Sequence, residues 1–155
     1  MKQQKIKVYR TTEGTIMEVV FLLMAVAVWG CIIYWVSRAP ETVPTHFRAD
    51  GTPDAYGSPM KILLPCIILT VLGGCMMLGA YFPHTVNLPF SISRPSQYPW
   101  VVRMMRIIGL LMLPLVFCIA LSALALPSHS IVPVISSIAA PIVASIVFTI
   151  LIYRA

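Results

Sequence analysis

Residues 107–153 read IIGLLMLPLVFCIALSALALPSHSIVPVISSIAAPIVASIVFTILIY, a stretch without Asp, Glu, Lys or Arg. A helix needs about 20 mostly apolar residues to cross the hydrocarbon core of a bilayer, so this stretch is long enough for two spans. The proline and small polar residues at 127–130 have turn chemistry and separate the two. The stretch therefore predicts two adjacent membrane-spanning helices, at about residues 100–126 and 131–153.

Two further apolar stretches precede this region, at about residues 16–37 and 59–82. Pro83 follows the second stretch and disfavours helical backbone at the residue before it. The chain is 59% hydrophobic and 10% charged, and its mean hydropathy is +0.89, which is far from the composition of soluble globular domains. We therefore predict an all-α integral membrane protein, a bundle of four transmembrane helices that forms a single membrane domain over residues 1–155.

Local signals mark the start of the first two predicted helices. Residues 15–18 read Thr-Ile-Met-Glu, which is the S/T-x-x-E spacing of a capping box. Ser58 followed by Pro59 is typical of an N-cap and the first helical position. We interpret Glu18 as the acidic member of its capping box, and the alternative is a functional acid at the membrane edge. Residues 36–39, Val-Ser-Arg-Ala, are a poor A-x-A cleavage site, so removal of the first span as a signal peptide is not expected.

The distribution of basic residues predicts the orientation, because cytoplasmic segments carry the excess of Lys and Arg. With the N-terminus inside, the cytoplasmic side holds Lys2, Lys5, Lys7, Arg10, Arg94, Arg103, Arg106 and Arg154. The outer side holds only Arg38, Arg48 and Lys61. We therefore expect both termini in the cytoplasm and the loop of residues 38–58 outside it.

The net charge of +6 does not predict nucleic-acid binding. The basic residues lie at the ends of the spans and do not form one continuous surface with interleaved aromatic residues, so no direct contact with nucleic acid is expected. Arg94, Arg103 and Arg106 are grouped on the cytoplasmic side. We interpret them as a cytoplasmic basic face that meets anionic lipid of the bilayer or a cytoplasmic protein partner.

The loop between the first two spans contains most of the polar residue types with reactive side chains. Residues 44–58 read PTHFRADGTPDAYGS, and the closely spaced prolines and glycines exclude a continuous helix. We predict a string of turns, with Asp50-Gly51 and Pro53-Asp54 as turn pairs. The candidate residues for binding a ligand or partner are Pro44, His46, Phe47, Gly51, Asp54, Tyr56, Gly57 and Ser58.

Three residues of this loop are of the types that coordinate divalent metals or transfer protons. They are His46, Asp50 and Asp54, within nine residues of one another. They lack a C-x-x-C or H-E-x-x-H frame, and are therefore weak metal candidates. We assign no catalytic residue, metal or cofactor, and favour a structural or partner-recognition role for the loop over an enzymatic one.

Small and polar residues form stripes within the predicted spans. The stripe of the last helix contains Pro133, Ser137, Pro141, Ser145 and Thr149, and that of the second helix contains Cys66, Thr70 and Gly74. Helices in membranes associate through such small residues. A polar pathway through the bundle is the alternative, but no Asp, Glu, Lys, Arg or His lies deep in a span, where proton relays and ion sites usually carry one. Packing is therefore favoured.

The loop residues resemble those of a bacterial family of small multi-pass membrane proteins of unknown function. The shared pattern is P-T-H-F-x-x-x-G-x-P-D-x-Y-G-S, matched here by Pro44, His46, Phe47, Gly51, Asp54, Gly57 and Ser58. The region from about residue 16 to residue 82 is similar to the N-terminal domain of the SdpI family of toxin-immunity proteins. A lysine usually follows the Gly-Ser pair in the family, whereas this chain has Pro59 there and Lys61 two positions later.

The resemblance implies a non-enzymatic protein of the bacterial inner membrane, of the immunity or signal-sensing type. It implies a secreted toxin or peptide as partner at the outer loop and a repressor protein as partner in the cytoplasm. Two alternatives stay open. One is a small transporter or channel component that works as a homo-oligomer through the stripe of the last helix. The other is a metal-binding or enzymatic site at the loop, with His46 and Asp54 as its central pair.

Overall fold

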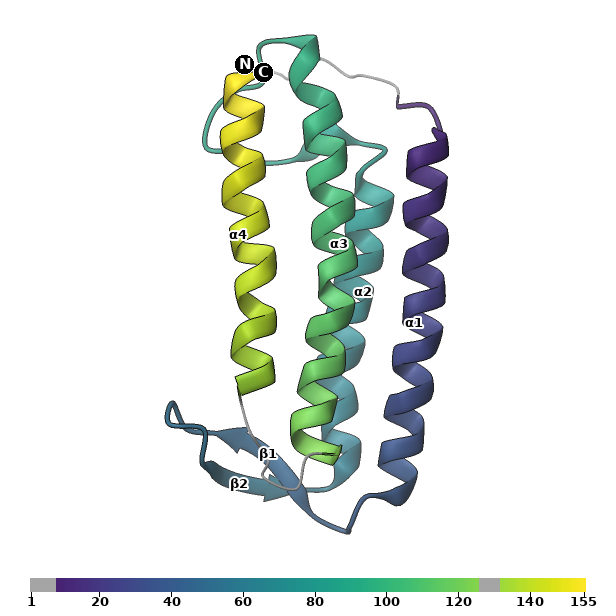
Figure 1. The fold of residues 1–155 in the computed structure, drawn as a ribbon, viewed down its shortest axis with the longest axis vertical. Helices are drawn as coiled ribbons and strands as arrows, with labels where there is room; N and C mark the ends of the chain where they lie inside the picture. Colours follow the sequence, from purple (N-terminus) through teal and green to yellow (C-terminus); the bar gives the residue numbers. More distant parts are fainter. Residues whose placement is uncertain (1–7, 126–131) are drawn as a thin grey trace.

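The computed structural model describes residues 8–125 and 132–155, and it is mostly helical. Its long helices are α1 (Thr12–Arg38), α2 (Leu63–Gly79), α3 (Tyr98–Ala120) and α4 (Val132–Arg154). The helices run side by side, with a β-hairpin across one end and the start of α1 and the C-terminal end of α4 near the other (Figure 1). Among the described residues, four helices are long and apolar enough to cross a membrane. The predicted helical architecture is confirmed to that extent.

Short helical segments extend α2 and α3. The 3-10 helix Pro59–Ile62 leads into α2, another 3-10 helix at Pro95–Gln97 leads into α3, and the π-helical turn Leu121–Ala125 follows α3. A third short 3-10 helix, Pro83–Thr85, follows α2. The helix α2 ends at Gly79, which is earlier than the predicted limit at residue 82. The predicted break between the last two spans falls on residues 126–131, outside the described residues.

The helix α3 lies at the centre of the bundle and packs against α1, α2 and α4. The backbones of α2 and α3 approach each other closely where two glycines face each other. A Cβ atom added to Gly73 would lie 2.9 Å from the backbone oxygen of Gly109, and the converse distance is also 2.9 Å. Small residues that let two backbones approach in this way are typical of helix contacts in membranes.

The stripe predicted for the second helix was partly wrong. Cys66 is buried and Thr70 Oγ1 accepts a hydrogen bond from Trp29 Nε1 at 3.2 Å, so both residues lie on contact surfaces of α2. Gly74, however, has open space around it and lines a pocket of about 310 Å³ between α1 and α2. Adjacent helical residues point about 100° apart, so it is Gly73 and not Gly74 that faces α3.

The stripe of α4 faces the bundle, and its hydroxyl groups are satisfied locally. Ser145 Oγ donates to the backbone oxygen of Pro141 at 2.7 Å, and Thr149 Oγ1 donates to that of Ser145 at 2.7 Å. Pro141 is buried, and α4 packs against α3. A hydroxyl that donates to its own helix backbone has no donor left for a solute, although its oxygen can still accept. This geometry favours the packing interpretation.

The helix starts agree with one prediction and correct another. Ser58 is the N-cap of the 3-10 helix before α2, with Pro59 at its first position, as predicted. The N-cap of α1 is Thr11, whose hydroxyl accepts from Gly14 N at 3.1 Å. Thr15 lies inside α1, so the predicted capping box of residues 15–18 was wrong. The helix begins earlier because Thr11 is itself an effective cap, and this leaves Glu18 available for other contacts.

Candidate functional site

The predicted loop forms a two-stranded antiparallel sheet rather than a string of turns. Strand β1 (Val43–Phe47) pairs with β2 (Pro53–Gly57), with irregular register on either side of His46. Pro53 opens β2 opposite Phe47, a position at the end of a two-stranded sheet that needs no backbone donor. The pair Pro53-Asp54 was therefore wrongly predicted as a turn. Two short runs separated by three to five residues that contain Gly are a usual signal of a hairpin, and this signal was present in residues 48–52.

The turn of the hairpin follows the predicted Asp50-Gly51 chemistry. Gly51 N donates to the backbone oxygen of Arg48 at 2.9 Å, and Gly51 has a φ of 86°, a conformation that favours glycine. Asp50 Oδ1 accepts from Thr52 N at 2.9 Å and from Thr52 Oγ1 at 2.6 Å. The hydrogen bond from the Thr52 hydroxyl lowers the pKa of Asp50, and the one from its backbone N–H adds to this. Asp50 and Gly51 thus fix the shape of the turn.

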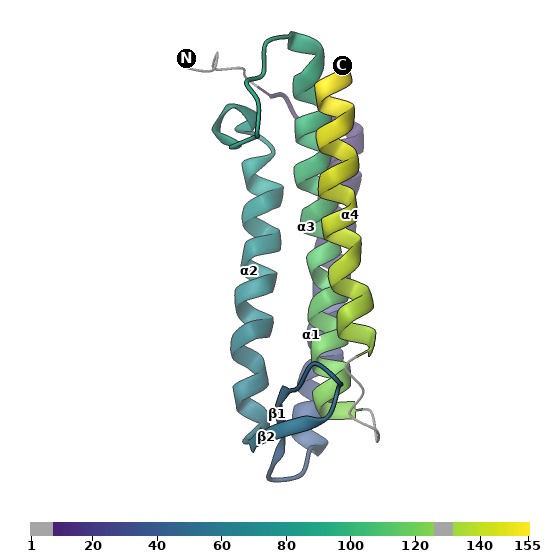
Figure 2. The same cartoon turned by 90° about the vertical axis from the view of Figure 1, so that its left-hand side faces the viewer.

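The hairpin is anchored to the bundle through β1. Val43 is 1% exposed and belongs to a buried cluster with Ile32 and Ile62, and Pro44 is also fully buried. The strand β1 contacts both the 3-10 helix before α2 and the π-helical turn after α3. The two views agree that the hairpin crosses the end of the bundle (Figure 1, Figure 2). The buried half of β1 therefore holds the exposed half in a defined position.

The exposed half of the hairpin brings together the two residues that the sequence singled out. His46 Nδ1 and Asp54 Oδ1 lie 2.5 Å apart, and Arg48 Nε lies 3.7 Å from Asp54 Oδ2. The His46 side chain is 69% exposed. The hydrogen bond from His46 lowers the pKa of Asp54, and the nearby charges of His46 and Arg48 lower it further. The result is a solvated cluster of one carboxylate and two basic groups.

The other predicted loop residues frame this cluster. Pro44 pairs with Tyr56 across the hairpin, and Tyr56 is exposed. Phe47 is half-buried at the end of β1, and Gly57 ends β2, where an added Cβ would lie 3.1 Å from the Lys61 side chain. Ser58 serves as the helix cap described above. Of these residues, Tyr56 contributes to the exposed surface of the hairpin, and the others maintain the shape of the hairpin.

The three metal candidates do not converge. Asp50 is engaged by Thr52 within the turn, whereas His46 and Asp54 pair with each other. Within residues 8–125 and 132–155, no three His, Cys, Asp or Glu side chains form a group that could hold a metal ion. The exposed face of the hairpin therefore carries one short ion pair, His46–Asp54, and not a converging set of three ligands.

The His46–Asp54 pair predicts a specific pH dependence. Because the pKa of Asp54 is lowered in the folded hairpin, its stabilising contribution is fully present above the ordinary Asp value of about 3.9 and is lost as the pH falls through the lowered pKa. We expect the carboxyl titration of Asp54, followed by NMR in micelles, to shift upward in His46→Ala. Asp50 is the internal control, since its pKa depends on Thr52. Equal Asp54 midpoints in the parent and the variant would contradict the pairing.

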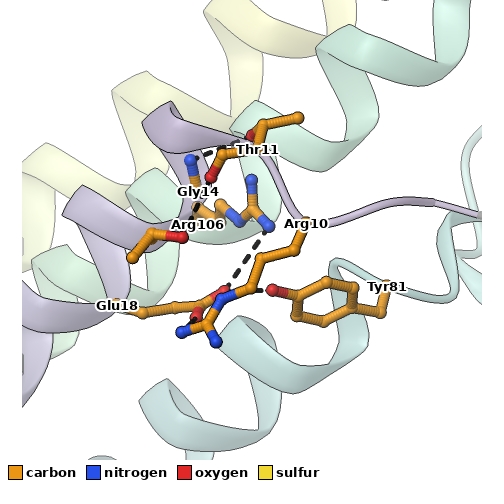
Figure 3. Close-up of polar contacts among 7 residues, drawn as sticks. Arg10, Thr11, Gly14, Glu18, Tyr81 and Arg106 are labelled. Carbon is orange, nitrogen blue, oxygen red and sulfur yellow. Dashed lines mark hydrogen bonds and ion pairs between the residues drawn. The ribbon is translucent and has the colours of Figure 1, made fainter.

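A second polar cluster, which the sequence did not predict, lies at the opposite end of the bundle. Glu18 of α1 accepts a hydrogen bond from the Tyr81 hydroxyl and another from Arg10 Nη2 at 3.2 Å (Figure 3). Arg106 Nη2 of α3 lies 3.6 Å from Glu18 Oε1, and the Arg106 guanidinium lies over the Tyr81 ring at 5.4 Å. The cluster joins α1, α3 and the segment after α2.

Gly14 lies where Arg106 meets α1. A Cβ atom at Gly14 would overlap the guanidinium, so the absence of a side chain there lets Arg106 lie against the helix backbone. The Arg106 side chain is only 4% exposed and that of Glu18 is 21% exposed. Charged groups at this depth require a partner. This requirement is the signal that could have identified the cluster from sequence, because Glu18 and Arg106 both lie near the same predicted membrane edge.

The predicted cytoplasmic basic face is therefore not one surface. Arg103 makes two hydrogen bonds to Glu13, Nε to Oε1 at 2.9 Å and Nη2 to Oε2 at 3.0 Å. Arg106 is buried. Of the three arginines, Arg94 alone is in the exposed class. On α1, Glu13 pairs with Arg103 and Glu18 with Arg106, so these two acidic residues neutralise part of the basic charge of α3.

Comparisons with known proteins match the hairpin and its flanking helices. Residues 22–70 match the family model described as "Domain of unknown function (DUF1648)", a region that includes most of α1, the hairpin and the beginning of α2. An uncharacterized protein from Archaeoglobus fulgidus is 38% identical over an alignment of 76 residues, covering 43% of this chain and 42% of that protein. The match thus spans less than half of the relative's length. No solved structure matches the chain.

Proposed function

We propose that this chain is a multi-pass membrane protein that recognises an extracytoplasmic ligand through its β-hairpin, in an immunity or signal-sensing role. One observation carries the proposal. The hairpin is fixed by the burial of Val43 and Pro44, yet it presents His46, Arg48 and Asp54 to solvent, where packing does not require them. Exposed polar residues on a rigidly held element are characteristic of binding surfaces.

The proposed topology places the hairpin outside a bacterial inner membrane and both termini in the cytoplasm. The hairpin lies at the end of the bundle away from the start of α1 and the end of α4 (Figure 1). Arg10, Arg103, Arg106 and Arg154 belong to the end where α1 starts and α4 ends, whereas Arg38 and Arg48 belong to the hairpin end. This asymmetry supports the orientation through the positive-inside rule. The four apolar helices would cross the bilayer.

The chemistry of the hairpin favours a peptide or small protein as the ligand. Asp54 can accept hydrogen bonds, His46 and Arg48 can donate them, and the exposed ring of Tyr56 offers apolar area on the same hairpin. Such a mixture of aromatic and charged groups suits a polar peptide better than a purely apolar solute. A secreted toxin or peptide would meet this surface, and a cytoplasmic repressor protein would meet the opposite end near the exposed Arg94.

A survival assay tests the recognition role. The full chain is expressed in sensitive bacterial cells, which are then challenged with a panel of secreted peptide toxins. We expect the chain to protect against at least one toxin, and the double variant His46→Ala/Asp54→Ala to lose that protection at equal membrane abundance. The matched control is Glu41→Ala, which removes an exposed carboxylate outside the two strands. Equal sensitivity of expressing and non-expressing cells across the panel would contradict the immunity role.

A further inference from the structure

A pocket of about 560 Å³ lies beside Arg106, at the end of the bundle opposite the hairpin. Its lining includes Thr11, Glu13, Tyr98, Val102, Arg103 and Arg106. The volume is within the range of pockets that bind small ligands. Two helices begin at this pocket, because Thr11 caps α1 and Tyr98 is the first residue of α3. The positive ends of two helix dipoles therefore meet there.

Arg106 provides an independent indication of the ligand's charge. Its Nε and Nη2 atoms are buried and have no hydrogen-bond partner among the described residues. Among the described residues, the carboxylate that pairs with Arg106 is that of Glu18, and it is already engaged, since Oε1 accepts from Tyr81 and Oε2 accepts from Arg10. A buried guanidinium with unmet donors is costly unless an anion compensates it. Arg106 lines the pocket, so the positive charge of its guanidinium would stabilise an anion bound there.

Arg103 supplies a second basic group at the pocket. It is about half exposed and is held in place by its paired hydrogen bonds to Glu13, which also lines the pocket. The guanidinium geometry suits the oxygens of a phosphate group. A bound phosphate would share Arg103 with Glu13, and the local charge would still favour an anion, because Arg10, Arg103 and Arg106 outnumber Glu13 and Glu18.

We propose that this pocket binds the phosphate group of an anionic lipid headgroup, with Arg106 and Arg103 as its ligands. A lipid is favoured over a free anion because the pocket lies at the end of apolar helices and Val102 gives its lining an apolar part. The site requires the helices to span a bilayer but does not depend on ligand recognition by the hairpin. Its failure and that of the proposed function are therefore distinguishable.

Lipid binding by the purified full chain tests the site. Phosphatidylglycerol is titrated against the chain in detergent, with native mass spectrometry as the readout, and phosphatidylcholine and inorganic phosphate are run as separate arms. We expect phosphatidylglycerol to bind most tightly. Arg103→Gln should weaken its binding at least about fivefold, and Arg106→Gln by about tenfold or more. Arg94→Gln is the matched control, since it makes the same charge change at an exposed residue outside the pocket lining.

Arg106→Gln removes a buried charge and can prevent folding. Arg103 and Glu13 are both partly exposed, so Arg103→Gln should fold, and its binding result then decides the test. An equal loss of phosphatidylglycerol binding in Arg94→Gln and Arg103→Gln would overturn the proposal, since it would reflect diffuse surface charge. Equal binding of phosphatidylcholine and phosphatidylglycerol would also overturn it. Displacement of phosphatidylglycerol by inorganic phosphate at similar concentration would assign the pocket to the free anion and overturn the choice of a lipid.

Discussion

Replacing Glu18 by alanine is expected to lower the free energy of unfolding by about 3 kcal/mol, the lower end of the range for breaking a buried ion pair. Arg106 would keep its buried position against α1 and lose the carboxylate at 3.6 Å, while Tyr81 would lose the acceptor of its hydroxyl. Unfolding of the purified chain in mixed micelles, followed by circular dichroism during titration with a denaturing detergent, measures the change.

Two companion variants separate the contacts of Glu18. Tyr81→Phe removes only the hydroxyl donor and should cost about 1 kcal/mol. Glu41→Ala removes an exposed carboxylate and should leave stability within about 0.5 kcal/mol of the parent. If Glu18→Ala were as stable as Glu41→Ala, the polar cluster would not hold α1, α3 and the segment after α2 together, and Arg106 would not stabilise the packing of α1 against α3.

Replacing Gly73 by alanine is expected to cost about 1–3 kcal/mol, as other substitutions that overpack a tight contact do. The new Cβ would lie 2.9 Å from the backbone oxygen of Gly109 and 3.1 Å from the Phe21 ring. A backbone oxygen cannot move away by changing rotamer, so α2 and α3 must separate. The same unfolding measurement detects the loss.

The neighbouring glycine offers a matched control for this contact. Gly74→Ala adds the same methyl group one residue later, where nothing lies within 4 Å, and helix propensity alone predicts no loss of stability. Gly109→Ala should resemble Gly73→Ala, because its Cβ would meet the Gly73 oxygen at 2.9 Å. Equal stability of Gly73→Ala and Gly74→Ala would show that the two backbones are not in close contact.

The helices could be predicted from the sequence because span length and the absence of charge are local properties. The apolar stretches of residues 16–37 and 131–153 differ from α1 and α4 mainly by a few residues at their ends. The start of α1 was misplaced because Thr11 and Thr15 are both acceptable caps, and the sequence pattern alone favoured the residue followed by an acidic side chain at the right spacing.

The hairpin was predicted only in part. His46 and Asp54 were paired only in the alternative of a metal-binding or enzymatic site. The strands were missed because Pro and Gly lower the β-propensity of both short runs, so the Asp-Gly signal between them was interpreted as an isolated turn. Their stability comes from the packing of Val43 and Pro44 on the helix ends, a tertiary contact that no local pattern encodes.

The Arg106 cluster could not be predicted from spacing. Glu18, Tyr81 and Arg106 come from three parts of the chain that meet only after the helices pack. Gly73 and Gly74 illustrate the same limit on a smaller scale. Both are small residues of one helix, and only the rotation of α2 about its axis decides which one faces α3.

The most direct test of the central claim, a hairpin exposed outside the membrane, is the labelling of single added cysteines in intact bacterial cells. Ala49→Cys lies in the exposed turn of the hairpin, and Ser91→Cys is exposed between α2 and α3 at the other end of the bundle. With a membrane-impermeant maleimide, and the unmodified chain as the background for its four native cysteines, we predict that Ala49→Cys is labelled in intact cells and Ser91→Cys only after permeabilisation. Labelling of Ser91→Cys but not Ala49→Cys in intact cells would contradict the account.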